Sequence, residues 1–347
     1  MISLSYKPYT LYKKHVFRIA GSTRTSTPVV LVRLRFESVD GFGEASMPPL
    51  YGESIATATD FLSRVDLAPF KDPFNAEEIL DYVDHIAPGN PAVKASIDIA
   101  LHDLIGKLLH IPLHSYFGLP GKELVTSKTI GIDTADIIRE RVREAHDFRF
   151  LKIKLGGEND REIIDTVRQE TDKPLYIDAN QGWKDKEKAL DKIEWLRDQN
   201  VIFIEQPMPT TALKDMEWLV ARSPLPLIGD ESIQRFTGVI SAGRYFHAIN
   251  IKLMKSTGLR EAYRMASAAR KTGLKIMLGC MSETSCAIAA ASQLGAMADW
   301  IDLDGNLGIK NDPFTGHKVE NGIIKPNGLP GLGLVTPNWD KIKPDVQ

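Results

Sequence analysis

The sequence predicts an α/β fold in which a TIM-like (β/α)7β barrel follows an α+β module. Two observations carry this prediction. From residue 127 onward, eight short apolar runs alternate with seven stretches of helical period, and such alternation indicates parallel strands joined by helices. Three of the runs end in an acid, and Asp178, Glu205 and Asp230 stand 27 and 25 residues apart. Each interval corresponds to one strand plus one helix.

The length of the chain indicates how many domains to expect, and its charge indicates which kinds of partner it binds. The chain has 347 residues, more than the roughly 250 that one barrel needs, so a second domain is expected. With 43 Lys and Arg against 45 Asp and Glu, the chain lacks the one-signed field expected of a protein that binds nucleic acid or a membrane surface. No apolar run approaches the roughly 20 residues of a membrane helix. The start does not resemble a secretory signal, and Cys280 and Cys286 are expected as free thiols, so we expect a cytoplasmic protein that acts on a small molecule.

Residues 1–120 are predicted to form the α+β module. Two candidate strands, HVFRIA and PVVLVRLRFES, come first, followed by FGEASMPP and by helical stretches that include PAVKASIDIALHDLIGKLLH. The segment 21–27 between the early strands and the run MPPLYGES after them have the composition of loops. Such loops can cover a barrel mouth and select substrates, or they can be ordinary connections.

The eight predicted barrel strands are short and rich in branched and aromatic residues, as in a buried parallel sheet. The segments between them, such as ADIIRERVREAHDF and REAYRMASAARKTG, have helical period, and Gly273 closes the second of these. After the eighth run the sequence becomes rich in Gly and Pro, so no eighth helix is expected. The predicted strands are 127–132, 151–155, 174–178, 201–205, 225–230, 247–253, 274–279 and 299–303.

Asp178, Glu205 and Asp230 are predicted to bind a divalent metal. They end three consecutive parallel strands, so their side chains are expected at one face of the barrel. Three buried carboxylates repel one another unless a cation lies between them. Oxygen ligands favour Mg²⁺, with Mn²⁺ as the alternative, and Asn180 is expected to support the site through a hydrogen bond or a water. The competing interpretation is that these acids cap the following helices.

Lys152 and Lys154 lie on the second predicted strand with one residue between them, so both project from the same face. Lys252 lies on the sixth predicted strand, across the barrel axis. Two ammonium groups are therefore expected to flank the barrel centre from opposite sides. A nearby metal and another cation disfavour the protonated lysine, which allows it to act as a base. Lys255 is interpreted as a surface residue outside the site.

Asp302 and Asp304 lie two residues apart on the eighth predicted strand, opposite Glu205. They are expected far from the metal-binding acids, so a substrate ammonium group is their expected partner; a helix cap or a salt bridge is the alternative. Just after the seventh strand, the run CMSETS supplies Met281 and Glu283 as candidates for substrate contact. Glu283 could instead cap the next helix.

This set of residues suits the removal of a proton next to a carboxylate. A metal that holds the carboxylate neutralises the charge of the enediolate that this step creates. With lysines on both faces, one removes the proton and the other returns one to the opposite side. The expected outcome is inversion of the α-carbon by two-base 1,1-proton transfer, with Lys154 and Lys252 as bases and Lys152 stabilising charge.

The motifs KIK, DAN, EQP, GDE and NIK at these intervals, preceded by the helix IDIALHDLIGK, resemble the enolase superfamily over nearly the whole chain. A lysine on the sixth strand without a histidine after the seventh resembles the muconate-lactonizing-enzyme subgroup rather than the mandelate-racemase subgroup. The motif Asp302-Leu303-Asp304 resembles the dipeptide epimerases. The resemblance implies a magnesium-dependent epimerase that inverts the C-terminal residue of a dipeptide, with L-Ala-D/L-Glu as the best-known substrate. It also implies a capping domain over 1–120, a barrel over 121–325, and a C-terminal segment, 326–347, that completes the capping domain.

The sequence indicates less clearly which side chain the inverted residue of the substrate carries. Arg24 in the N-terminal loop is placed to meet an acidic side chain, which favours a Glu-containing dipeptide and a role in cell-wall peptide recycling. Glu53 and Asp60 indicate instead a basic side chain, and related epimerases accept hydrophobic or cationic dipeptides.

Three other readings stay open. A cycloisomerase or an o-succinylbenzoate synthase-type lyase would share the barrel, but it would leave the acid pair on the eighth strand unexplained. A noncatalytic peptide-binding scaffold would not need lysines on both sides of the site. The sequence does not fix the oligomeric state, and a homo-oligomer is compatible with it.

Overall fold

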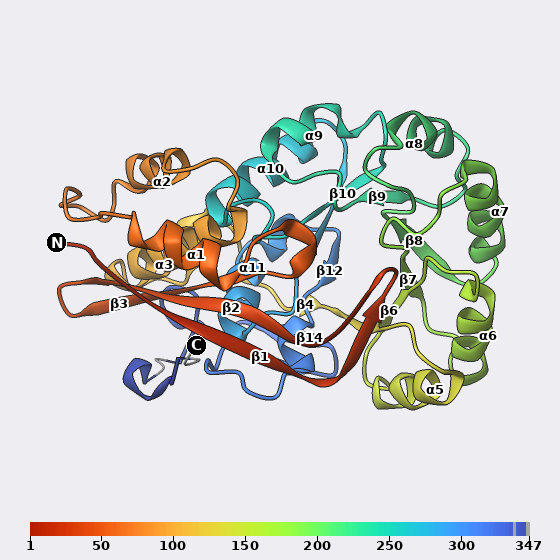
Figure 1. Ribbon diagram of the computed structural model, residues 1–347, viewed down its shortest axis with the longest axis horizontal. Coiled ribbons are helices and arrows are strands. Elements are labelled where there is room, and N and C mark those ends of the chain that lie inside the picture. The colour runs from red at the N-terminus through yellow and green to blue at the C-terminus, as the bar shows by residue number, and fades with distance from the viewer. Residues whose placement is uncertain (336–337, 345–347) are drawn as a thin grey trace.

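The computed structural model describes residues 1–335 and 338–344. Its centre is a parallel sheet of eight strands in the order β5 to β12, and helices surround it (Figure 1). Thr126, just before β5, forms a parallel bridge with Ile301 of β12, so the sheet is a nearly closed barrel. The predicted barrel fold is confirmed. Its strands are β5 (Ser127–Ile130), β6 (Phe150–Lys154), β7 (Leu175–Asp178), β8 (Val201–Glu205), β9 (Leu227–Gly229), β10 (Ala248–Ile251), β11 (Lys275–Gly279) and β12 (Trp300–Asp302).

Strand register brings the ends of neighbouring strands to one level. Lys154 of β6 pairs with Asp178 of β7, and Asp178 pairs with Glu205 of β8. Glu205 pairs with Ile228 of β9, two residues before Asp230. Because parallel strands share one direction, the charged residues of these strands are presented at the same mouth of the barrel.

All seven stretches with helical period in the barrel form helices. After β12 only a short 3-10 turn, η3 (Gly305–Gly308), follows, so within the described residues no eighth barrel helix forms, as predicted. The helices are α5 (Ala135–Glu144), α6 (Asp160–Glu170), α7 (Lys186–Arg197), α8 (Leu213–Val220), α9 (Phe236–Ala242), α10 (Leu259–Lys271) and α11 (Ser285–Ser292).

The N-terminal module pairs a three-stranded antiparallel sheet with helices. Its strands are β1 (Ser3–Ile19), β2 (Ser22–Phe36) and β3 (Val39–Ser46). Its helices are η1 (Pro49–Tyr51), α1 (Ile55–Ser63), α2 (Ala76–His85), α3 (Pro91–Leu108) and α4 (Leu113–Tyr116). The predicted strand HVFRIA is only the end of β1, because the preceding residues alternate weakly and are mostly half-exposed. β3 is missed by the sequence analysis because two glycines interrupt its pattern.

The β1–β2 hairpin extends from the N-terminal module to the barrel mouth (Figure 1). It turns at Gly21, whose φ of +81° is readily adopted only by glycine. The prediction that segment 21–27 is a loop is wrong from Ser22 onward, because these residues pair with β1. The tip is fixed to the barrel, where Ile132 N donates to Arg18 O at 2.9 Å and Arg18 pairs with Asp133 at 2.5 Å.

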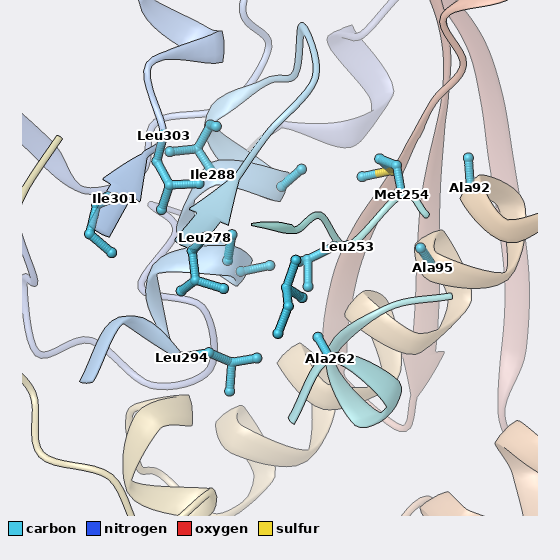
Figure 2. Close-up of a cluster of buried hydrophobic side chains, with 14 of the residues drawn as sticks. Ala92, Ala95, Leu253, Met254, Ala262, Leu278, Ile288, Leu294, Ile301 and Leu303 are labelled. Carbon is cyan, nitrogen blue, oxygen red and sulfur yellow. The ribbon is translucent and has the colours of Figure 1, made fainter. Parts of the chain in front are cut away.

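Helix α3 joins the module to the barrel. Figure 2 shows Ala92 and Ala95 of α3 close to Met254, which follows β10, with Leu253 and side chains of α10, β11 and α11 continuing the cluster. These residues belong to one hydrophobic core that extends through both parts of the molecule. A second, smaller cluster, made of Tyr176, Phe203, Ile228, Ala248 and Met277, fills the barrel interior.

The C-terminal segment returns to the N-terminal module. Lys7 of β1 donates to the carbonyl oxygens of Trp339 and Ile342, each at 2.7 Å. Asp103 of α3 accepts a hydrogen bond from Leu332 N at 2.9 Å. Before this return, a small sheet forms from β4 (Leu124–Val125), β13 (Lys318–Glu320) and β14 (Ile323–Lys325), and η4 (Trp339–Lys341) lies near the end.

None of the helices in the described part of the chain is long and apolar enough to cross a membrane.

Candidate active site

A cavity of about 770 Å³ lies between the β1–β2 hairpin and the carboxyl ends of the barrel strands. The hairpin contributes residues 13–19 and Arg24, so the N-terminal module and the barrel share the cavity. Of the residues predicted for the site, those that line it are Arg24, Lys152, Lys154, Asn180, Asp230, Lys252, Met281, Asp302 and Asp304.

Asp178, Glu205 and Asp230 are brought together as predicted. All three are buried, and one carboxylate oxygen of each lies within 4.8 Å of the others. The second oxygen of each acid accepts a hydrogen bond from a neighbouring residue. Asn180 N donates to Asp178 Oδ1 at 2.9 Å, and Asn250 Nδ2 donates to Glu205 Oε1 at 2.7 Å. The ammonium group of Lys255 donates to Asp230 Oδ1.

The remaining oxygen of each acid meets a lysine from the cavity. Lys154 Nζ lies 2.6 Å from Asp178 Oδ2, and Lys252 Nζ lies 2.6 Å from Asp230 Oδ2. Lys152 Nζ forms an ion pair with Glu205 Oε2 at 2.6 Å. The angles of this contact are not those of a hydrogen bond, so Glu205 Oε2 accepts no hydrogen bond from the described residues. One oxygen of each acid is thus tied back, and the other points to a shared centre.

The charges of this centre fit a divalent cation. Burial and the charge of Asp178 raise the pKa of Glu205 to about 8. Burial also disfavours the charge on Asp178, but Lys154 and Lys152 outweigh it and lower the pKa of Asp178 to about 2. A divalent cation would favour the ionised form of all three acids. Three carboxylate oxygens without nitrogen or sulfur ligands suit Mg²⁺ or Mn²⁺.

Neighbouring acids hold Lys252 and Lys152 in their charged form. Burial disfavours the charge on Lys252, but Asp230 and Glu205 outweigh it and raise the pKa of Lys252 well above its usual range. Burial also disfavours the charge on Lys152, but Asp302 and Glu205 outweigh it and raise the pKa of Lys152 well above its usual range. A cation that engaged the acids would weaken this hold, and the lysine protons would then leave more easily.

The interpretation of Lys255 as a surface residue is wrong. Its side chain is 1% exposed, and its Nζ donates to Asp230 O at 2.6 Å, Asn250 O at 3.1 Å and Ile233 O at 3.3 Å, besides the Asp230 carboxylate. The turn that follows β10 points Lys255 inward, and the residue period of a strand does not describe that turn. The only signal in the sequence is the apolar setting of the run NIKLMK.

Asp302 does not lie far from the three acids predicted to bind a metal, so that expectation is wrong. Lys152 Nζ reaches both Asp302 Oδ2 and Glu205 Oε2 at 2.6 Å, because its long side chain spans the narrow barrel. Ser127 Oγ donates to Asp302 Oδ1 at 2.7 Å. Asp304 accepts from Thr129 N at 2.8 Å and lies 3.3 Å from Lys128 Nζ.

Arg24 is a cation of the outer cavity that lacks an acid partner among the described residues. Within the described residues it forms no ion pair, and its Nε is buried without a hydrogen bond, while burial lowers the pKa of Arg24. Lys13 lies near it, and burial and the charge of Arg24 lower the pKa of Lys13 to about 8. Sequence analysis misses Lys13, which lies on a strand too weakly patterned to be recognised.

Two acids proposed for substrate contact lie outside the cavity lining. Glu53 accepts hydrogen bonds from Ala92 N and Val93 N at 3.0 to 3.2 Å, so its carboxylate caps the start of α3. Glu283 is buried and accepts a hydrogen bond from Met281 N at 2.8 Å. Asp60, on α1, is exposed beside Arg64. The prediction of substrate contact by Glu53 is therefore corrected, because its lone pairs already serve the helix.

Both cysteines are free thiols, as expected; Cys280 lines the cavity and Cys286 is buried. Sequence analysis also misses Glu231, which lines the cavity next to Asp230. The motif GDE could have indicated it, since the residue after a predicted ligand shares its location.

Two family descriptions cover most of the chain. Residues 8–118 match the mandelate racemase/muconate lactonizing enzyme N-terminal domain, and residues 134–341 match the enolase C-terminal domain-like family. The chain is 50% identical to the L-Ala-D/L-Glu epimerase of Bacteroides thetaiotaomicron over 96% of this chain and 88% of that protein.

Solved structures are similar over nearly their whole length. The substrate-liganded L-Ala-D/L-Glu epimerase from Bacillus subtilis has a TM-score of 0.89 and 27% identity, covering 97% of this chain and 98% of that one. The Enterococcus faecalis dipeptide epimerase, in complex with Mg and L-Leu-L-Tyr, has a TM-score of 0.89 and 29% identity, covering 96% of this chain and 99% of that one.

Proposed function

The chain belongs to the mandelate racemase/muconate lactonizing enzyme family of the enolase superfamily, and from this premise we propose that it is a divalent-metal-dependent dipeptide epimerase. The observation that carries the proposal is the placement of Lys154 and Lys252 on β6 and β10, with three metal-binding acids on the strands between them. The relatives named L-Ala-D/L-Glu epimerase support the same activity.

Asp178, Glu205 and Asp230 would hold Mg²⁺ or Mn²⁺. When bound, the cation neutralises negative charge that develops on the substrate carboxylate. Lys154 and Lys252 act as the two bases: each takes the α-proton from one stereoisomer, and the other lysine supplies a proton to the opposite face. Lys152, between Glu205 and Asp302, stabilises charge.

The favoured substrate is L-Ala-D/L-Glu. Asp302 and Asp304 are the acids proposed to receive the ammonium end, and both line the cavity. Arg24 is proposed to receive the acidic side chain, because a half-buried guanidinium with a buried, unpaired Nε and no protein carboxylate calls for an anionic partner. A hydrophobic or cationic side chain would leave Arg24 unpaired. A cytoplasmic role in recycling cell-wall peptides accords with such a substrate.

The test is a panel of L,L-dipeptides incubated with the protein and Mg²⁺ in heavy water, with the α-proton followed by NMR. We expect exchange with inversion at the C-terminal residue, fastest for L-Ala-L-Glu. Absence of exchange with every dipeptide would overturn the epimerase, and dipeptide binding without exchange would indicate the peptide-binding scaffold.

Single replacements test the two bases. In Lys154→Met and Lys252→Met, exchange should be lost more severely from one stereoisomer than from the other, with opposite preference in the two variants. Lys186→Met, a surface change beside Asp215, is the matched control. If both isomers exchanged normally in both active-site variants, the two-base assignment would be wrong.

A further inference from the structure

Glu231 is a buried carboxylate in the cavity that the proposed chemistry leaves unused. It follows Asp230 at the carboxyl end of β9 and is 5% exposed. Within residues 1–335 and 338–344 it forms no ion pair. Its Oε1 accepts one long hydrogen bond, 3.4 Å from Asn180 Nδ2, and its Oε2 is buried without a partner. Such a group needs a donor from outside the protein.

Asn180 supplies a second acceptor of the same kind. It follows β7, lines the same cavity, and its Oδ1 is also buried without a hydrogen-bond donor. Glu231 and Asn180 therefore bring two unpaired oxygens to the ends of β7 and β9, the strands on either side of β8. Glu205 ends β8, so these oxygens flank the proposed metal centre.

The chemistry of a hydrated cation matches these oxygens. Among the described residues, Asp178, Glu205 and Asp230 form the one group of acids with ligand atoms close enough together to hold a metal ion, and Glu231 is not part of it. Mg²⁺ takes six oxygen ligands and keeps several waters. Three acids supply three of these oxygens, which leaves positions for water or substrate. A bound water carries two protons, and Glu231 Oε2 and Asn180 Oδ1 are buried acceptors that lack a donor; the other unpaired carboxylate oxygen of this centre, Glu205 Oε2, belongs to an acid assigned as a ligand of the cation.

We propose that Glu231 and Asn180 form an outer acceptor pair that takes hydrogen bonds from water bound to the cation. Glu231 is then a positioning residue: it strengthens cation binding and orients the bound water without being a ligand. The inference rests on the proposed function, because the cation is the one assigned there to the three acids. Replacing a residue that hydrogen-bonds a metal ligand commonly weakens metal binding by about 10- to 100-fold.

The experiment measures cation binding without dipeptide. Chelator-treated protein is titrated with Mn²⁺, with affinity read by electron paramagnetic resonance and with the number and exchange rate of bound waters read by oxygen-17 relaxation. For Glu231→Ala we expect the Kd for Mn²⁺ to rise about 10- to 100-fold, the number of bound waters to stay constant, and their exchange to become faster. Glu231→Gln, which keeps one acceptor oxygen and the shape, should show the same change to a smaller extent.

The control removes a carboxylate from the far part of the same cavity. Glu144 lines the cavity beside Arg141, and Glu144→Gln should leave Mn²⁺ binding unchanged. Should the alanine variant fail to fold, the glutamine variant decides. Unchanged affinity and water exchange would overturn the proposal. One additional bound water would make Glu231 a direct ligand, and a raised KM with unchanged cation binding would make it a substrate contact; both overturn it.

Failure of the proposed function has a different signature. Parent protein that binds Mn²⁺ but epimerises no dipeptide would refute the epimerase and leave the binding result intact. Parent protein that epimerises while Glu231→Ala binds Mn²⁺ normally would refute only the role of Glu231.

Discussion

Arg24 is the residue whose environment says most about the substrate side chain. It enters the cavity from the β1–β2 hairpin, and in the described structure no carboxylate pairs with it. Arg18, on the same hairpin, is already neutralised by Asp133 at 2.5 Å. The two arginines therefore differ in what they can offer a ligand, and only Arg24 has its charge available.

We predict that Arg24→Gln impairs the epimerisation of L-Ala-L-Glu selectively. A hydrogen bond to a charged group contributes about 1.5–3 kcal/mol, so kcat/KM for this dipeptide should fall by roughly 10- to 100-fold, mainly through KM. Steady-state kinetics with L-Ala-L-Glu and L-Ala-L-Gln measure the effect. Arg197→Gln, an exposed change on α7, serves as the control, and an equal loss with both dipeptides would contradict the assignment to the side chain.

At the residue scale, alternation and strand spacing were sufficient to predict the three acids and the lysines Lys152 and Lys154. The period of a strand fixes which side a residue faces, and strand ends fix its level. Strand period and spacing do not predict how far a long side chain extends or which partner it contacts. Lys152 spans from β6 to Asp302, and Lys255 turns inward after its strand. Glu53 is captured by the amides of α3, a partner that only the folded chain brings near it.

At the scale of elements, β3 and α3 illustrate a close contact that depends on glycine. Gly41 and Gly43 lie on β3 where α3 crosses it. A Cβ added at Gly43 would lie 1.9 Å from Ser96 O, and one at Gly41 would lie 2.1 Å from Ala100 O. Both clashes involve helix backbone, which cannot rotate away. The same glycines lower the strand propensity of the run GFGEAS and explain why the sequence does not indicate a strand there.

Gly43→Ala is therefore expected to destabilise the protein. Overpacking of a well-packed core costs about 1–3 kcal/mol, occasionally more, and here the helix and strand must separate. Urea unfolding followed by circular dichroism measures the loss. Gly238→Ala is the matched control: its Cβ would lie 3.7 Å from the nearest atoms, and alanine favours helix α9. Equal stability of both variants would show that β3 and α3 are less tightly packed than described.

The helices and strands of the barrel could be predicted because each lies within one sequence window. The hairpin could not, since residues 3–14 have no strong alternation and gain their strand structure from pairing with β2. Its position over the barrel mouth depends on contacts with segments more than 100 residues away, such as Arg18 with Asp133 and Lys13 with Ile309.

At the scale of the whole molecule, buried carboxylates join the N-terminal module to the barrel. Glu44 of β3 accepts hydrogen bonds from Thr284 N at 3.0 and 3.1 Å, at the start of α11. Asp98 of α3 accepts from Leu259 N at 2.5 Å and Arg260 N at 3.2 Å, at the start of α10. In both contacts an acid of the module caps a barrel helix, which fixes the cavity between the two parts.

His102 makes the Asp98 contact dependent on pH. Its ring lies 3.3 Å from Asp98 Oδ1 and is buried. Burial disfavours the charged ring, but the charge and hydrogen bonds of Asp98 outweigh it and raise the pKa of His102 above its usual 6.5. A raised pKa means that the folded chain binds this proton more tightly than the unfolded chain. The resulting stability is fully present below pH 6.5 and is lost as pH rises through the pKa of the folded state.

We predict that His102→Gln removes the contribution of His102 to the free energy of unfolding and leaves the rest of its dependence on pH unchanged. The free energy of unfolding of the parent should exceed that of the variant most at pH 6, and the difference should shrink as pH rises above 6.5. Glu44, whose pKa burial and Glu283 raise to about 8, also stabilises the folded chain less as pH rises. It does so in both proteins, so the difference isolates His102. Urea titrations of metal-free protein from pH 6 to pH 9 measure it, and His85→Gln, an exposed change on α2, is the control. A difference that stayed constant or grew with pH would mean that the ring is neutral in the folded protein and that Asp98 holds the two parts together without a charged partner.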